Sequence, residues 1–470
     1  MPNEAGIQVG RIEAYLEERR RLTSQVKNRI IEVLQLPLEE DKMDLDCPLF
    51  GSGLGLDSVD AVGLAAMIET DFGVHVEDSD ISMFRSINSI VDYILRKKAE
   101  LETGEEPPGL PRSTFEAAHL DGRPESGGDR EEEGCLDYLA LRTQVGLIEF
   151  RSATTILVEG AEADTLIDFL VAGNLTDLAV GCLLHSVVLD EKGGISAIVW
   201  LARKEEGYLV LANGQRRQSL LDCFHRYRGG KLVEIADLSD QRMTLAVIGP
   251  RAQEMIVDVV DEELLRLGYG EFEILERGPR KLFVGRYGET GEYDYRLSLP
   301  VEEAAEIREE LLDSGSIYHI RDCRPEILPT LMMEMKSIDQ ESMIISGCSP
   351  RQVDLLWMID FRKNDFLGRE MLLRSLKEDR PHSILLVADD GCGIQRGSRI
   401  TLGDLDVGFV QSALFSPVLS KTILFSYVQS PFAYPNVLFQ VTGKDKRSVP
   451  ATSRSAPLFL TQTVMQSFNM

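Results

Sequence analysis

A stretch rich in proline, glycine and acidic residues divides this chain into two unequal folding units. Within residues 99–134, positions 105–109 read EEPPG and positions 129–133 read DREEE. Such segments cannot bury enough apolar surface to fold by themselves. We interpret residues 99–134 as a solvated acidic linker, flexible enough to let one unit visit the other. The chain of 470 residues must therefore contain at least two domains.

The two units differ in hydrophobic periodicity. In residues 11–98 apolar side chains recur at helical spacing, which predicts an all-α domain. Residues 135–375 alternate helical and strand patterns, which predicts an α+β domain, and residues 376–455 are nearly all strand and turn, which predicts a β-barrel. The expected strands include 154–158, 195–201, 244–248 and 422–427, and the expected helices include 162–172, 251–267 and 301–314.

The charge balance excludes several classes of partner. The chain carries 50 Lys and Arg against 77 Asp and Glu, a net charge of −27, which disfavours binding to nucleic acid or to an acidic membrane. The acidity is concentrated in residues 1–134, which carry 14 basic and 29 acidic residues and are therefore expected to dock on basic partners. Seven scattered cysteines without a CxxC pair predict reduced thiols and no metal site. Since neither a signal peptide nor a membrane helix is apparent, we expect a cytoplasmic protein.

A serine stands at the start of a predicted amphipathic helix. Residues 50–60 read FGSGLGLDSVD, and Ser58 occupies the position of a helix N-cap, after the glycine-rich loop. A hydroxyl group held there is exposed, and Asp57 and Asp60 on either side are favoured by the positive end of the helix dipole. The glycines do not form a phosphate-binding loop, because no Lys-Ser or Lys-Thr follows them.

Residues 24–98 closely resemble acyl carrier proteins, whose signature is an Asp-Ser block that opens the second helix. The resemblance implies a four-helix carrier bundle over residues 11–98. It also implies that Ser58 receives 4′-phosphopantetheine from a phosphopantetheinyl transferase and then carries groups supplied by acyl- or aminoacyl-loading enzymes. Acidic residues of the second helix would dock these partners: Asp57, Asp60 and Glu69. The alternative interpretation is that Ser58 only caps the helix.

Several blocks in residues 135–470 occur in one order. They read LVAGNLTD at 170–177, AVIGPRA at 246–252, GRYGETGE at 285–292 and DFLGREMLLR at 365–374. Their order and spacing resemble the glycine-cleavage aminomethyltransferase superfamily, which includes the T-protein and whose members bind tetrahydrofolate and move one-carbon units. The resemblance implies an α+β folate-binding domain around a channel, followed by a C-terminal β-barrel.

A pocket for a reduced pterin requires three kinds of group. A carboxylate can accept its amino group and ring N–H together, an aromatic face can stack on the ring, and a basic group can hold the glutamyl tail. In this sequence Asp294 aligns best with the family's carboxylate, and Glu292 is a rival. Asp294 could instead be a surface strand residue, and Trp357 plain core. The resemblance assigns folate binding to Asn213, Tyr287, Glu292, Asp294, Trp357 and Arg396.

The family's catalytic aspartate is missing. The T-protein has an Asp soon after a Gly-Gly pair, and the ungapped position in this sequence is Ala197. Proton transfer by a carboxylate at that position is therefore not available. Three interpretations remain: the reaction needs no acid there, another group replaces the Asp, or the domain binds without catalysing. The candidates for a replacement are Asp190, Glu191 and His185.

Together these features predict a carrier-linked, tetrahydrofolate-dependent transferase of one-carbon units (aminomethyl, methylene or methyl) in a biosynthetic pathway. Its substrate would be an intermediate tethered to the phosphopantetheine arm. The alternative is a non-catalytic carrier and docking protein, and a third interpretation is a transferase that acts on a free small molecule. The arginine-rich segment 216–228 is expected to be a solvated face, with docking of the acidic carrier helix as its alternative function.

Overall fold

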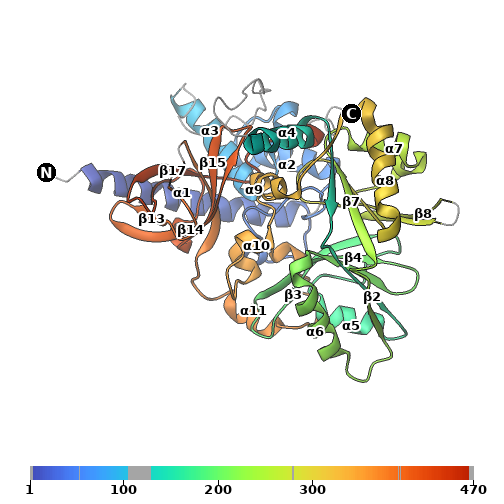
Figure 1. Cartoon of the computed structure of the whole chain (residues 1–470). Helices are drawn as coiled ribbons and strands as arrows, with labels where there is room; N and C mark the ends of the chain where they lie inside the picture. Colours follow the sequence, from blue (N-terminus) through green and yellow to red (C-terminus); the bar gives the residue numbers. More distant parts are fainter. Residues whose placement is uncertain are drawn as a thin grey trace.

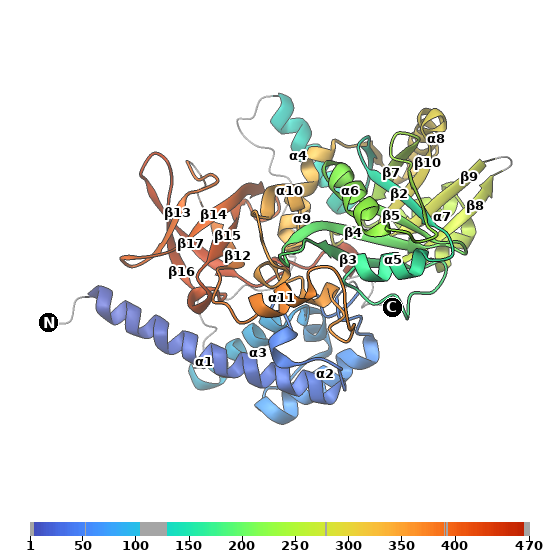
Figure 2. The ribbon, with the colours of Figure 1, turned by 90° about the horizontal axis from the view of Figure 1, so that it is seen from below.

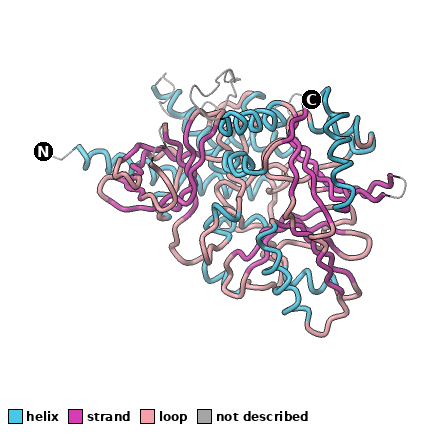
Figure 3. The backbone as a smooth tube through the Cα atoms, viewed as in Figure 1, coloured by secondary structure: helices cyan, strands magenta, loops and turns pink. Residues whose placement is uncertain are grey.

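The molecule consists of a helical domain, two β-sheets and a β-barrel (Figure 1). The two sheets interleave along the chain, because the first strand of the six-stranded sheet precedes all strands of the five-stranded sheet. Helices predominate at the N-terminal end, and strands predominate from the first sheet onward (Figure 3). None of the helices described below combines the length and the apolar run that crossing a bilayer requires. The computed structural model describes residues 4–51, 53–103, 129–277, 280–389, 391 and 393–464.

The N-terminal domain is all-α, as predicted. Its core contains Val26, Ile30, Leu64, Ile68 and Ile90, all with less than 1% of their surface exposed, and the apolar spacing of these residues defines the helices. The third of its four main helical elements is a 3-10 helix. The elements are α1 (Glu4–Val33), the short η1 (Glu40–Lys42), α2 (Ser58–Phe72), η2 (Asp78–Met83) and α3 (Ile87–Thr103).

Helix covers both ends of the segment that we interpreted as a linker. Helix α3 continues to Thr103, and α4 (Asp129–Thr143) begins before position 134. Residues 104–128 lie outside the described part of the chain.

The first sheet of the α+β domain has five antiparallel strands in the order β3-β4-β5-β2-β6. Side chains alternate along β4, so that Ala197, Val199 and Leu201 face the helices α5 and α6, whereas Ile198 and Trp200 face the other side. The elements are β2 (Thr154–Glu159), α5 (Ala163–Leu170), β3 (Leu183–Leu189), β4 (Ile195–Arg203), β5 (Tyr208–Ala212), α6 (Arg217–Arg228) and β6 (Glu234–Asp237).

The second sheet has six strands in the order β11-β1-β7-β10-β9-β8, and α7 and α8 pack on it. The helix expected at 301–314 has these bounds in α8, whereas the expected helix 251–267 is divided into α7 and the 3-10 helix η4 (Glu262–Arg266). The elements are β1 (Val145–Phe150), β7 (Arg242–Ile248), α7 (Ala252–Val259), β8 (Glu271–Arg277), β9 (Arg280–Arg286), β10 (Asp294–Pro300), α8 (Val301–Ser314) and β11 (Ile320–Asp322).

The C-terminal barrel is closed, in the order β12-β15-β14-β13-β16-β17. Helix α1 runs along the barrel (Figure 2), and Leu16 of that helix packs into the barrel's apolar cluster. The expected barrel is therefore confirmed, and the N-terminal domain lies directly against it. The strands are β12 (His382–Ala388), β13 (Arg399–Leu402), β14 (Leu405–Ser416), β15 (Lys421–Val428), β16 (Leu438–Thr442) and β17 (Ser448–Arg454).

A buried charged cluster joins the barrel to the α+β domain through α9 (Leu328–Met335). The carboxylate of Glu334 is fully buried and accepts hydrogen bonds from Tyr138 Oη (2.7 Å) and Ser416 Oγ (2.6 Å). Its second oxygen lies 2.6 Å from Arg142 Nη2. Because Tyr138 and Arg142 lie on α4 and Ser416 lies at the end of β14, this cluster fixes α4, α9 and β14 relative to one another.

We expect Glu334→Ala to lower the free energy of unfolding by about 3–5 kcal/mol, because it removes the carboxylate 2.6 Å from the buried Arg142 guanidinium and leaves only Glu292, at 3.5 Å, to balance its charge. Glu334→Gln, which keeps the size of the side chain and one acceptor oxygen, should cost less. Urea unfolding followed by circular dichroism measures both. The matched control is Glu205→Ala at an exposed position, which should change the stability by less than about 0.5 kcal/mol. Equal losses for Glu334→Ala and Glu205→Ala would contradict this account of the cluster.

Candidate functional site

The hydroxyl of Ser58 is exposed and free. We predicted Ser58 as the N-cap of its helix, and this is wrong: Asp57 is the cap, and its Oδ1 accepts from the backbone N–H of Val59 (2.7 Å) and Asp60 (3.0 Å). Asp60 completes the capping box by accepting from Asp57 N. Within the described part of the chain the Ser58 hydroxyl has no hydrogen-bond partner. The interpretation of Ser58 as only a helix cap therefore loses its basis.

The acidic residues of α2 differ in how they are held. Asp57 and Asp60 stabilise the start of the helix and remain at the surface. Glu69 accepts from Val76 N (3.0 Å) and lies 2.6 Å from His75 Nδ1, and these two partners hold the pKa of Glu69 below its usual value. All three carboxylates stay on the outside of the domain, where the prediction of a docking role remains untested.

A large cavity of about 310 Å³ lies between the two sheets and α9. Two of the six predicted folate residues, Asn213 and Tyr287, line it. Three residues that the sequence did not point to line it as well: Trp200, Glu289 and Arg296. The large cavity therefore offers a carboxylate, two aromatic rings and a guanidinium, the three kinds of group that a reduced pterin with an acidic tail needs.

Asp294 lies behind the wall of the large cavity. Its oxygens are each 3.2 Å from the guanidinium of Arg296, and its side chain packs over Gly288. Arg296 in turn lies 4.8 Å from the centre of the Tyr287 ring. Burial raises the pKa of Tyr287 to about 12, so its hydroxyl stays protonated. Asp294 thus positions Arg296, and it is Arg296 that reaches the large cavity.

Two other predicted folate residues lie elsewhere. Glu292 accepts from the backbone N–H (3.1 Å) and the hydroxyl (2.6 Å) of Thr463, and its other oxygen is 3.5 Å from Arg142 Nη1. It anchors the C-terminal segment. Arg396 is exposed in the loop before β13 and does not line the large cavity. The sequence could not show that Glu292 and Arg396 lie outside the large cavity, because their places in the fold depend on how distant segments of the chain meet.

A small cavity of about 60 Å³ adjoins the large one, and Glu289, Ile198 and Ile338 line both. The predicted folate residue Trp357 lines the small cavity. Two residues of the N-terminal domain, Asp46 and Pro48, form part of the wall of the same cavity. The carrier-like domain and the α+β domain therefore share one cavity.

His185 and Glu289 form a pair at the junction of the two cavities. His185 Nε2 lies 2.9 Å from Glu289 Oε1, and the imidazole stacks on Trp200 with ring centres 4.1 Å apart. The edge of Trp357 faces the imidazole at 5.6 Å, and neither ring nitrogen of His185 makes a hydrogen bond of good geometry among the described residues. Burial alone would raise the pKa of Glu289, but His185 and Arg296 hold it below its usual value. The carboxylate therefore stays ionised beside the imidazole.

The other candidates for the missing acid lie away from both cavities. Ala197 points into the core beneath α5 and α6, whereas the cavity side of β4 presents Ile198. Asp190 accepts from the backbone of the β3–β4 turn, and exposed Glu191 accepts from Tyr227 Oη (2.7 Å). Of the three candidates named from sequence, His185 is the one that lines a cavity. Among the described residues, no three His, Cys, Asp or Glu side chains gather in a way that would hold a metal ion.

Known proteins match both halves of the chain. Residues 24–94 match the family model of the phosphopantetheine attachment site, and residues 132–363 match that of the GCVT N-terminal domain. A carrier-attachment domain is therefore fused to an aminomethyltransferase-like domain. Both family resemblances that the sequence suggested are thus confirmed.

Individual relatives cover most of the second half. An aminomethyltransferase of Thermotoga sp. (strain RQ2) is 28% identical over 303 residues, which is 62% of this chain and 80% of the relative. One from Streptomyces coelicolor is 28% identical over 315 residues, or 66% and 83%. The crystal structure of the glycine cleavage system aminomethyltransferase T from Bartonella henselae superimposes with a TM-score of 0.64 at 21% identity, over 69% of this chain and 89% of that one. This structural likeness shows the fold of the second half.

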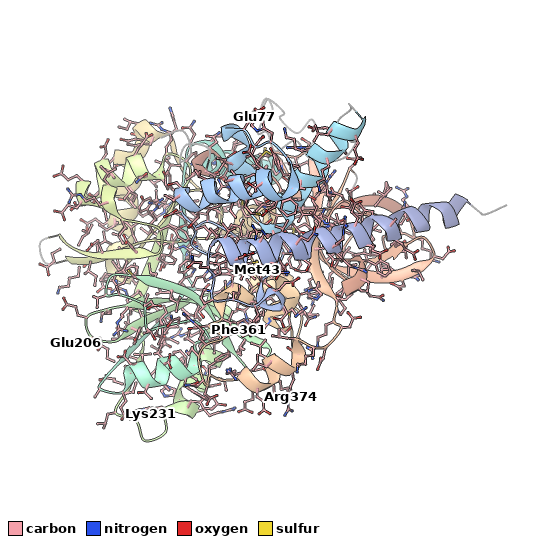
Figure 4. The ribbon with its side chains drawn as sticks, turned by 180° about the vertical axis from the view of Figure 1, so that it is seen from behind. Met43, Glu77, Glu206, Lys231, Phe361 and Arg374 are labelled. Carbon is pink, nitrogen blue, oxygen red and sulfur yellow. The ribbon has the colours of Figure 1, made fainter. Side chains whose placement is uncertain are left out.

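The lowered pKa of Glu289 predicts a pH effect on stability. An ionised carboxylate favoured by folding stabilises the protein above its unfolded pKa, and this contribution is lost as the pH falls through the lower folded pKa. Glu289→Gln should therefore weaken the loss of stability below roughly pH 4. Urea unfolding at pH 6 and pH 3 measures the effect, with the exposed Glu206→Gln (Figure 4) as control. An unchanged pH dependence in Glu289→Gln would contradict the assignment.

Proposed function

We propose that this protein transfers a one-carbon unit between tetrahydrofolate and an intermediate tethered to its own 4′-phosphopantetheine arm. The observation that carries the proposal is the shared small cavity. Asp46 and Pro48 of the carrier domain and His185 and Glu289 of the aminomethyltransferase-like domain line the same space. An arm attached to the carrier therefore starts from a domain that forms part of the wall around the groups that would act on its cargo.

The path from Ser58 to this cavity is short. The backbone N–H of Leu56 donates to the carbonyl of Leu49 (3.0 Å), and Leu49 directly follows Pro48. Backbone geometry then keeps the Cα atom of Ser58 within roughly 17 Å of that of Pro48. An extended phosphopantetheine arm spans this distance, so delivery does not require the carrier domain to leave its place.

The large cavity suits the folate. Glu289 can accept the paired N–H groups of a pterin, Tyr287 and Trp200 offer faces for stacking, and Arg296 supplies the positive charge for an acidic tail. When bound, tetrahydrofolate would supply or accept the one-carbon unit. Because Glu289 also lines the small cavity, a folate in the large cavity and an arm in the small one would meet at this residue.

His185 is the group that we expect to move a proton. Glu289 Oε1 lies 2.9 Å from its Nε2, and among the described residues neither ring nitrogen makes a hydrogen bond of good geometry, which leaves Nδ1 available to the cargo. The stacked Trp200 and the edge of Trp357 exclude water from the ring. An imidazole held in this way can give a proton to, or take one from, a nitrogen of the cargo. His185 would replace the carboxylate that Ala197 lacks.

One observation favours a second function, a non-catalytic carrier and docking protein. The cavity side of β4 presents Ile198 and Trp200 and no carboxylate, as a scaffold that binds without catalysing would. Titration with tetrahydrofolate and turnover of methylene-tetrahydrofolate by the arm-bearing protein separate the two functions. Turnover supports the transferase, whereas absence of turnover, with or without folate binding, supports the scaffold.

The arm itself can be tested by mass. After incubation with coenzyme A and a phosphopantetheinyl transferase, the protein should gain the mass of one phosphopantetheinyl group, because the Ser58 hydroxyl is exposed and unpartnered. Ser58→Ala should gain nothing, whereas Thr70→Ala, which removes an exposed hydroxyl from the same helix, should be modified normally. Intact-mass spectrometry reads all three. An unmodified wild type, or modification of Ser58→Ala, would refute the carrier assignment.

Removing the proposed acid–base group should slow transfer without weakening folate binding. For His185→Gln we expect the rate to fall by about 10²–10⁴-fold, the usual contribution of a positioned acid or base. The Kd for tetrahydrofolate should change little, since the imidazole stands on the arm side of Glu289. Rapid-quench transfer of a labelled one-carbon unit to the native cargo, with isothermal titration of the folate, measures both. A normal rate in His185→Gln would exclude this role.

A further inference from the structure

A short acidic segment of the carrier domain, Asp44-Leu45-Asp46, is bound by the aminomethyltransferase-like half. Asp46 Oδ2 lies 2.7 Å from Lys336 Nζ, and the same ammonium lies 2.6 Å from Asp354 Oδ2 and 3.2 Å from the carbonyl of Ser383. The side chains of Lys336 and Asp46 are each only 3% exposed. Although burial opposes the charge on Lys336, Asp354 and Asp46 raise its pKa. The ammonium therefore stays charged between the two carboxylates.

The second acidic residue of this segment binds backbone rather than side chain. Asp44 Oδ2 accepts from the N–H groups of Leu356 (2.6 Å) and Trp357 (3.3 Å), and the Asp44 side chain is buried. Two carboxylates two residues apart thus meet two complementary sets of donors, one ammonium and one pair of amides. The neighbouring Lys42 places its ammonium 5.2 Å from the centre of the Phe361 ring, on the side of the molecule where Figure 4 labels Met43 and Phe361.

A second contact zone fixes the orientation of the carrier on the barrel. Asp92 of α3 pairs with Arg19 of α1 (2.5 Å), accepts from Asn436 Nδ2 (2.9 Å) and also accepts from the hydroxyl of Ser455. The hydroxyl of Ser86 donates to the carbonyl of Ala456 (2.8 Å). Two separate zones exclude a pivoting contact, so the domain is held in one orientation.

The contacts described above leave α2 free. Val59 and Val62 on this helix are 75% and 60% exposed, and the hydrogen bonds of Asp57 and Asp60 lie within the start of the helix. The arginine-rich segment 216–228 does not take up the carrier helix either. Its Arg217 pairs with Asp237 and Asp240 of its own domain. The carrier is therefore held through a different face from the one next to Ser58.

We propose that Asp44-Leu45-Asp46 is a recognition element by which the aminomethyltransferase-like half holds its own carrier domain in place, and that the arm moves while the domain stays. The docking surface is formed by Lys336, Asp354 and the amides of Leu356 and Trp357, and the partner that it fits is this carrier. The role of the arm rests on the proposed function, whereas the docking does not. A loading enzyme can approach α2 and Ser58 while the carrier remains docked.

Cutting the connection between the halves tests the docking directly. A specific protease site is placed within residues 104–128 of the full chain, the purified protein is cleaved, and the two pieces are analysed by size-exclusion chromatography at decreasing concentration. The wild-type pieces should elute together. Lys336→Met, which leaves Asp46 and Asp354 buried without their cation, should weaken the association by about 30-fold or more. Asp44→Ala should also weaken it, because two amides lose their acceptor.

Two variants serve as controls. Lys192→Met removes an exposed ammonium outside the interface, and Val62→Ser changes the free face of α2, so both should leave the association unchanged. Circular dichroism of the uncut variants checks their folding, and Asp44→Ala keeps the test valid if Lys336→Met unfolds. Separation of the wild-type pieces, or equal release by Val62→Ser and Asp44→Ala, would overturn the proposal. The measurement uses neither arm nor folate, so an inactive protein that stays associated would refute the proposed function alone.

Discussion

A single buried ammonium group contacts all three parts of this molecule. Lys336 contacts Asp46 of the carrier domain, Asp354 of the aminomethyltransferase-like domain and the carbonyl of Ser383 at the start of the barrel. Such a cluster contributes little net stability compared with apolar packing, because the ions must be desolvated. Removing one of its members nevertheless lowers the free energy of unfolding strongly. The main effect of the cluster is therefore to favour one arrangement of the three parts. In this arrangement every charge is paired, whereas displaced arrangements leave a charge buried and unpaired.

The position of Lys336 at the end of α9 gives this geometry a functional consequence. The same helix carries Glu334, whose buried carboxylate binds Tyr138, Arg142 and Ser416. One short helix thus connects α4, the barrel and the carrier, and it also borders both cavities. A change in how the carrier docks must act on the cavity wall, because Asp44 binds the backbone of Trp357, whose side chain faces His185.

Local features of the sequence predicted the fold well and the site only in part. The bounds of α8 and the exposed serine at the start of α2 follow from patterns within a few residues, and the structure has both. The pocket residues depend on which way a strand faces and on which segments meet. Because side chains alternate along β4, Ala197 points into the core. Asp294 pairs with Arg296, which lies two positions further along β10. Glu289 stood in a recognised block, but its role appears only when β3 brings His185 beside it.

The cap of α2 shows the same limit of sequence-based prediction on a smaller scale. Both Asp57 and Ser58 are good N-cap residues, and the sequence alone favoured Ser58. Asp57 takes the role because the capping box with Asp60 satisfies two backbone N–H groups and the N–H of Asp57 itself. The hydroxyl that a carrier needs for its arm is thereby kept out of the helix's own hydrogen bonds. A helix start that is capped one residue earlier can hold a reactive serine rigidly without consuming it.

A docked carrier changes what the connecting segment has to do. A tether raises the effective concentration of one domain at another to about the millimolar range, and it does so for every orientation of the domain, productive or not. The Asp44-Leu45-Asp46 contact selects one orientation, in which Pro48 already forms part of the wall of the small cavity. In the function that we propose, only the arm then has to search for its site, and the space that it searches depends on the length of the prosthetic group and not on the length of the linker. Fusion into one chain places a carrier domain beside each aminomethyltransferase-like half, and Asp44 and Asp46 select its docked orientation.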